Sequence, residues 1–148
     1  MINKKKWLII SSVGIILCGV ILYLVTPRKQ TYSDINIQLD KTSDFTTDEL
    51  NQGVEVVVNF FNTNWQESTL KAIEFDNNLY QNEIATKDEG ARSFSDYSKE
   101  NILIFTTYFK TGNKTDGSVS PHTEMGPWQF ILIRQNKNSS WQVIDQGV

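Results

Sequence analysis

The chain has 148 residues, a formal net charge of −3 and a single cysteine, Cys18. From Gln30 onward it has nine Lys or Arg and seventeen Asp or Glu, so this part carries 9 − 17 = −8. So acidic a segment is a poor nucleic-acid binder, because phosphate contacts need clustered Lys and Arg. Since no cysteine follows Cys18, this segment also lacks disulfides and thiolate metal sites.

An uncharged apolar run extends from Trp7 to Val25 and is long enough to cross a bilayer as a helix. It is longer than the apolar core of a typical cleaved signal peptide, and no small-x-small cleavage site follows it. Leu17 precedes Cys18, where a lipoprotein signal has a small residue. We therefore expect residues 1–29 to form an uncleaved membrane anchor with basic flanks, through which the protein contacts the membrane.

The orientation of this anchor follows from the charges on its two sides. Lys4, Lys5 and Lys6 precede the apolar run, whereas Arg28 and Lys29 follow it. The positive-inside rule favours a cytoplasmic N-terminus and an extracellular C-terminal domain, in a single-pass protein of the cell membrane. The difference in charge is small, and the opposite orientation stays open.

Residues 30–45 are polar with scattered apolar side chains. Ile35, Ile37 and Leu39 alternate, which is typical of a short edge strand. A polar tether between the membrane and the domain is an equal alternative.

A long amphipathic helix is predicted over Thr47–Asn64. Thr46 and Glu49 have the spacing of a capping box, in which each residue satisfies a backbone N–H of the other. Apolar residues then recur at helical spacing along one face: Leu50, Val54, Val57, Val58, Phe61 and Trp65.

The remainder is rich in β-branched and aromatic residues. Strands are predicted over Thr69–Asp76, Asn101–Lys110, Trp128–Gln135 and Trp141–Asp145. Between them we expect a short helix or irregular loop over Leu79–Ser98, a long connection over Thr111–Pro127 and a hairpin turn over Asn136–Ser140. The predicted fold class is α+β: an N-terminal transmembrane helix, then a domain over 46–148 with a long helix packed on a curved antiparallel sheet.

The C-terminal half resembles an uncharacterised domain family of Gram-positive secreted, lipid-anchored and single-span proteins. The resemblance covers about residues 45–148 and rests mainly on these residues: Trp128, Phe130, Ile131, Leu132, Arg134, Trp141, Val143, Asp145 and Gly147. The chain departs from the family pattern at Val148, where an aromatic residue is usual, and at Glu67 and Ser68, where a cysteine is often found. The resemblance implies a cone-shaped fold of the nuclear-transport-factor-2-like (NTF2-like) or cystatin-like kind and implies no activity.

Two sets of residues are candidates for acid–base chemistry. His122, the only histidine, lies in the long connection and has Glu124 and Asp116 as possible partners. A solvated loop histidine is the simpler interpretation. Alternatively, Asp76 or Glu74 would act as a buried base with Tyr108 as hydrogen-bond donor, as in isomerases of cone folds. Asp76 is also in a position typical of a turn residue.

The remaining candidates are apolar or structural. Aromatic side chains would line an apolar pocket or, more simply, form the core: Trp65, Trp128, Trp141, Phe60, Phe61, Phe105 and Phe130. Arg134 would pair with Asp145 or stack on Trp141. Residues 113–118 have oxygen-rich loop chemistry but too few carboxylates for a calcium loop. We expect no metal, cofactor or catalytic set.

The sequence therefore favours a membrane-anchored extracytoplasmic domain that binds a protein partner or a small apolar ligand. Two alternatives stay open: a cone-fold enzyme with a carboxylate or histidine base, and an immunity-like protein that blocks a partner at the membrane.

Overall fold

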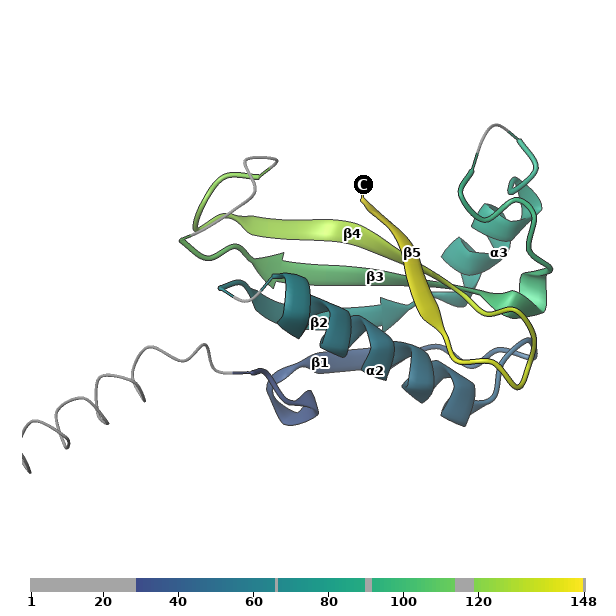
Figure 1. Cartoon of the computed structure of the whole chain (residues 1–148), viewed down its shortest axis with the longest axis horizontal. Coiled ribbons are helices and arrows are strands. Elements are labelled where there is room, and N and C mark those ends of the chain that lie inside the picture. Colours follow the sequence, from purple (N-terminus) through teal and green to yellow (C-terminus); the bar gives the residue numbers. More distant parts are fainter. Residues whose placement is uncertain (1–28, 66, 90–91, 114–118, 148) are drawn as a thin grey trace, which may run out of the picture.

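A computed structural model describes residues 29–65, 67–89, 92–113 and 119–147 (Figure 1). Within these residues no helix has the length and apolar character needed to span a bilayer. The predicted anchor, Trp7–Val25, lies outside the described residues.

The domain is built on one five-stranded sheet with the order β1-β2-β3-β4-β5. Strand β1 pairs parallel with β2, and all other neighbours pair antiparallel. The strands are β1 (Asn36–Leu39), β2 (Thr69–Phe75), β3 (Ile102–Lys110), β4 (Glu124–Ile133) and β5 (Gln142–Gly147). The α+β class is confirmed, but the sheet is mixed and not purely antiparallel.

Strand β1 was one of the two alternatives for residues 30–45, and the structure shows it. Only four residues long, β1 forms the edge of the sheet beside β2. Parallel neighbours need a crossover connection, and helix α2 (Thr47–Asn64) provides it. The β1-α2-β2 unit therefore carries the helix onto one face of the sheet (Figure 1).

Helix α2 has the bounds predicted from the sequence. Gly53 allows it to approach the sheet closely, since a Cβ atom there would lie 2.7 Å from Phe105 Cε2 and 2.8 Å from Leu103 Cδ1. Of the predicted aromatic residues, Phe61, Phe105, Phe130 and Trp141 belong to the buried core, whereas Phe60, Trp65 and Trp128 are partly buried and pack against it. Phe109, which was not predicted, is also fully buried there.

Several predicted boundaries differ from the observed ones, and two of these differences have a clear local cause. Helix α3 (Asn77–Ala85) begins two residues earlier than the expected Leu79, because Asp76 caps it and accepts hydrogen bonds from the Asn78 and Leu79 amides. Strand β4 begins at Glu124 instead of Trp128. Gly126 and Pro127 suggested a loop, but an irregularity in the β3–β4 register accommodates them.

Candidate functional site

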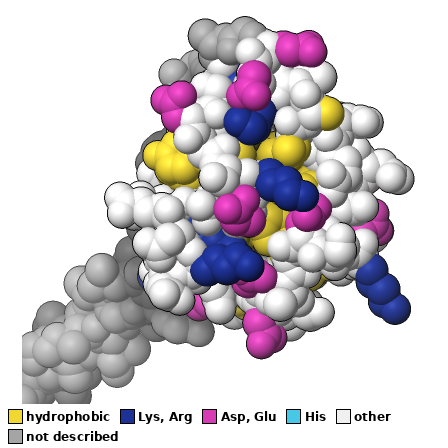
Figure 2. Space-filling model, turned by 90° about the vertical axis from the view of Figure 1, so that its right-hand side faces the viewer, with side chains coloured by type: hydrophobic (Ala, Val, Ile, Leu, Met, Phe, Trp, Pro, Cys, Tyr) yellow, Lys and Arg dark blue, Asp and Glu magenta, His cyan; other side chains and the backbone are white. Residues whose placement is uncertain are grey.

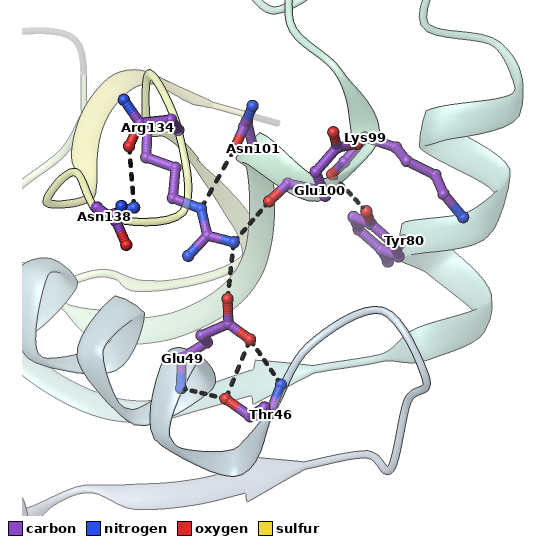
Figure 3. A network of polar contacts seen from close by, with 9 residues as sticks. Thr46, Glu49, Tyr80, Lys99, Glu100, Asn101, Arg134 and Asn138 are labelled. Carbon is purple, nitrogen blue, oxygen red and sulfur yellow. Dashed lines mark hydrogen bonds and ion pairs between the residues drawn. The ribbon is translucent and has the colours of Figure 1, made fainter.

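Arg134 is the only charged residue that is buried among the described residues, at 3% exposure. It follows β4 and lies where the β4–β5 hairpin meets the start of α2 and the 3₁₀ turn η2 (Lys99–Asn101) (Figure 3). Its Nη2 atom lies 2.7 Å from Glu49 Oε1 and donates to the Glu100 carbonyl at 2.8 Å. Its Nε donates to Asn101 Oδ1 at 3.4 Å.

The guanidinium also stacks on an aromatic ring, 4.4 Å from the ring centre of Trp141. Of the two predicted partners, Trp141 is therefore confirmed. The other prediction was wrong: the partner carboxylate belongs to Glu49, while Asp145 accepts a hydrogen bond from the Ser93 hydroxyl. Sequence reasoning found Glu49 as a capping residue and missed this second role, because its two oxygens serve two different elements.

The hydrogen bonds to the two carboxylate oxygens of Glu49 explain why its pKa is lowered. Oε2 accepts from the Thr46 backbone N–H at 2.8 Å and from the Thr46 hydroxyl at 3.0 Å, which confirms the capping box, while Oε1 faces Arg134. Burial opposes ionisation, but the hydrogen bonds from Thr46 and Arg134 outweigh it and hold the pKa of Glu49 below its usual value.

A second polar group joins α3 to the loop before α2. Asp44 accepts from Lys99 Nζ at 2.9 Å and from Gln81 at 2.6 Å, and these hydrogen bonds lower the pKa of Asp44. The buried Tyr80 hydroxyl donates to the Lys99 carbonyl at 2.8 Å, and burial, with a smaller effect of Asp44 and Glu100, raises its pKa. Both polar groups connect structural elements, so we assign them a structural role.

The histidine set is not assembled in the described residues. His122 lies in the loop before β4 with a positive φ of 56°, and its side chain is exposed. Its backbone N–H donates to the Gly112 carbonyl at 3.3 Å. Asp116 and most of the oxygen-rich loop lie outside the described residues. Within the described ranges, no group of three or more His, Cys, Asp and Glu side chains is placed to hold a metal ion.

The carboxylate set is divided. Asp76 is the exposed N-cap of α3, which is the turn role that the sequence also allowed. Glu74 and Tyr108 do share a face: Glu74 pairs with Thr106, and Ala72 pairs with Tyr108, so the two are diagonal neighbours on adjacent strands. That face points away from α2, because the alternate residues Leu103 and Phe105 contact the helix.

A polar hollow of about 400 Å³ lies where the chain joins the domain. Its lining residues come from the start of the described chain and from the segment that begins β2: Lys29, Gln30, Asp34, Glu67, Ser68, Thr69 and Lys71. No sequence motif predicted it, because its two halves are about 40 residues apart in the chain and are brought together by the Gln30–Leu70 hydrogen bonds, next to the parallel β1–β2 pairing.

A family profile described as a domain of unknown function (DUF4829) matches residues 36–147. The chain belongs to the DUF4829 family. The match begins at β1 and ends with β5, so the DUF4829 domain coincides with the five-stranded sheet and its helices. Comparison with curated proteins and with solved structures found no match. In this DUF4829 domain the Arg134 contacts lie within the matched region, whereas Lys29, Gln30 and Asp34 of the hollow precede it.

Proposed function

We propose that this chain is a single-pass membrane protein of a Gram-positive bacterium, whose DUF4829 domain lies outside the cell and acts as a non-catalytic binding or accessory module. The apolar run Trp7–Val25 and its three preceding lysines support the anchor and its orientation. The segment from Gln30 onward carries a net charge of −8, which supports a water-exposed domain outside the bilayer.

One observation carries the non-catalytic assignment: the space between α2 and the sheet is filled by aromatic rings. Phe61 and Phe109 lie with ring centres 5.3 Å apart, Trp65 and Phe109 are 4.9 Å apart, and Phe60 and Phe130 are 5.7 Å apart. A cone-fold enzyme would hold its buried base in this space. The rings also occupy the place where a small apolar ligand would bind, so we favour a protein partner.

We further propose that the domain belongs to the NTF2-like or cystatin-like superfamily. The long helix laid across a curved sheet supports this, as does the aromatic interior (Figure 1).

The orientation is tested by adding protease to intact protoplasts that express the full chain with a C-terminal epitope. We expect loss of the epitope without lysis, whereas a cytoplasmic marker protein stays intact. Protection of the epitope until the cells are lysed would reverse the proposed topology.

The non-catalytic role is tested by complementation of a deletion strain with the triple variant Glu74→Gln, Tyr108→Phe, His122→Gln. These changes remove the histidine, the Glu74 carboxylate and the Tyr108 hydroxyl from exposed or half-buried positions, and leave Asp76 in place because it caps α3. We expect the triple variant to restore the deletion strain to the same extent as the unchanged chain does. Loss of rescue, with equal protein level and melting temperature, would favour the enzyme alternative.

A further inference from the structure

The chain is attached firmly to the domain at Gln30. The Gln30 side chain donates to the Leu70 carbonyl at 2.9 Å and accepts from the Leu70 N–H at 2.6 Å. Its backbone N–H donates to Asn62 Oδ1 and its carbonyl accepts from Asn62 Nδ2, both at 3.1 Å. These four hydrogen bonds connect Gln30 to both β2 and α2. Gln30 is therefore part of the folded domain and not of a flexible tether.

This attachment limits the distance between the domain and a membrane. If Trp7–Val25 spans the bilayer, only residues 26–29 separate the span from Gln30. Four extended residues reach at most about 14 Å. The headgroup layer of each leaflet is roughly 5–7 Å thick. The hollow, which includes Lys29 and Gln30, therefore lies beside the headgroups.

The chemistry of the hollow suits an anion. Asp34 and Glu67 balance the formal charges of Lys29 and Lys71, but both carboxylates have partners of their own: Asp34 accepts from the Thr31 N–H and hydroxyl, and Glu67 also has an interaction partner. Among the described residues, neither Lys29 nor Lys71 forms a side-chain hydrogen bond or ion pair, and both side chains are exposed.

Hydroxyl groups add to this pair of ammonium groups. Ser68 Oγ accepts from the Gly112 N–H at 3.3 Å, which leaves its own O–H able to donate, and Thr69 lies beside it. Two ammonium groups and hydroxyl donors are a combination that binds a phosphate group.

We propose that this hollow binds the phosphate of an anionic phospholipid headgroup and fixes the orientation of the domain on the membrane. The inference rests on the proposed membrane anchor. It adds a lipid ligand, with Lys29 and Lys71 as the residues that recognise it.

The net negative charge of the domain opposes this contact, but each charge acts only over a screening length of about 8 Å at physiological salt. Figure 2 shows the opposite end of the domain, around α3 and the start of α2, where acidic and basic side chains are interspersed. Charges at that end are screened from the headgroups, so the charges that line the hollow decide the contact.

The test uses the full chain in lipid nanodiscs that contain phosphatidylglycerol with a photoactivatable group on its headgroup. We expect cross-links at residues 67–71, and a decrease on the order of tenfold in the double variant Lys29→Gln, Lys71→Gln. The matched control, Lys41→Gln with Lys137→Gln, removes two exposed lysines at the other end and should keep the cross-links. Equal melting temperatures of both variants exclude a folding effect.

Three outcomes would overturn the proposal in distinguishable ways. A chain that washes off membranes at alkaline pH lacks the anchor, so the proposed function fails as well. A chain that stays membrane-integral without cross-links at 67–71 disproves the headgroup site alone. Calorimetric binding of free glycerol phosphate by chain in phosphatidylcholine nanodiscs, with no lipid cross-link, would assign the hollow to a water-borne phosphate instead.

Discussion

Arg134 shows how a single side chain holds three segments of this domain together. It contacts α2 through Glu49, η2 through the Glu100 carbonyl, and the residue directly before β5, Trp141, through its ring. A buried guanidinium needs partners for its charge and its donors, and here the Glu49 carboxylate, the Glu100 carbonyl and the Asn101 amide oxygen provide them. Its position in the family pattern is thus explained by structure and not by chemistry on a substrate.

Replacing Arg134 with Met is expected to lower the free energy of unfolding by about 3 kcal/mol, because the partly buried Glu49 carboxylate loses its cationic partner. Urea denaturation at pH 7 measures the loss. Lys137→Met, at an exposed position in the same hairpin, should change stability by less than about 0.5 kcal/mol. Similar losses in both variants would contradict the assigned role of Arg134.

Stability should also depend on acidity through Glu49 and Asp44. In the folded chain the pKa values of both carboxyl groups lie below those of the unfolded chain. In the unfolded chain Glu and Asp have pKa values of about 4.3 and 3.9. The unfolded state therefore takes up protons first as the pH falls, so the contribution is complete above about pH 5 and decreases through the folded pKa values. We expect the free energy of unfolding, measured with urea, to fall between about pH 5 and about pH 3.

The variant Glu49→Gln separates this effect from general acid unfolding. It should be less stable at pH 7 and lose less stability on acidification, because one of the two titrating carboxylates is gone. Glu55→Gln, an exposed carboxylate on the same helix, serves as control. If both variants showed the same pH dependence as the unchanged chain, Glu49 would not be a source of the acid sensitivity.

At the scale of elements, the distance between α2 and the sheet is set by Gly53. Helix propensity alone would make Gly53→Ala stabilising by about 1 kcal/mol. The added Cβ would lie below 3 Å from the Phe105 and Leu103 side chains, and overpacking of a tight core costs roughly 1–3 kcal/mol.

We therefore expect Gly53→Ala to lower the melting temperature, whereas Gln52→Ala, at the exposed neighbouring position, should leave it unchanged or slightly higher. Differential scanning calorimetry compares the two. A more stable Gly53→Ala variant would show that α2 can move away from the sheet without loss.

For the whole molecule, the contact that determines its relation to the membrane is Gln30 with Leu70 and Asn62. In Gln30→Ala the Leu70 N–H loses its acceptor, so its hydrogen exchange in the full chain should become faster on the order of tenfold. Gln38→Ala, an exposed position in β1, should leave Leu70 unchanged. Equal protection in all three chains would mean that the attachment at Gln30 is not formed in solution.

The sequence by itself determined the features that depend on neighbours in the chain. The Thr46–Glu49 capping box and the apolar spacing fixed the helix Thr47–Asn64, and the β-branched run fixed the strand near 101–110, because caps and periodicity act over a few residues. The aromatic core and the stacking of Arg134 on Trp141 were also foreseeable, since alternation along a strand assigns side chains to one face.

Only the tertiary structure decided the contacts between distant segments. The parallel β1–β2 pairing, the Glu49–Arg134 ion pair and the hollow between Lys29 and Lys71 each join residues separated by tens of positions. Four residues of β1 carry too little pattern to reveal their partner, and a charged side chain gives no sign of which of many opposite charges it will meet. These contacts form because burial of the α2 face brings the segments together, and that requirement acts on the folded chain as a whole.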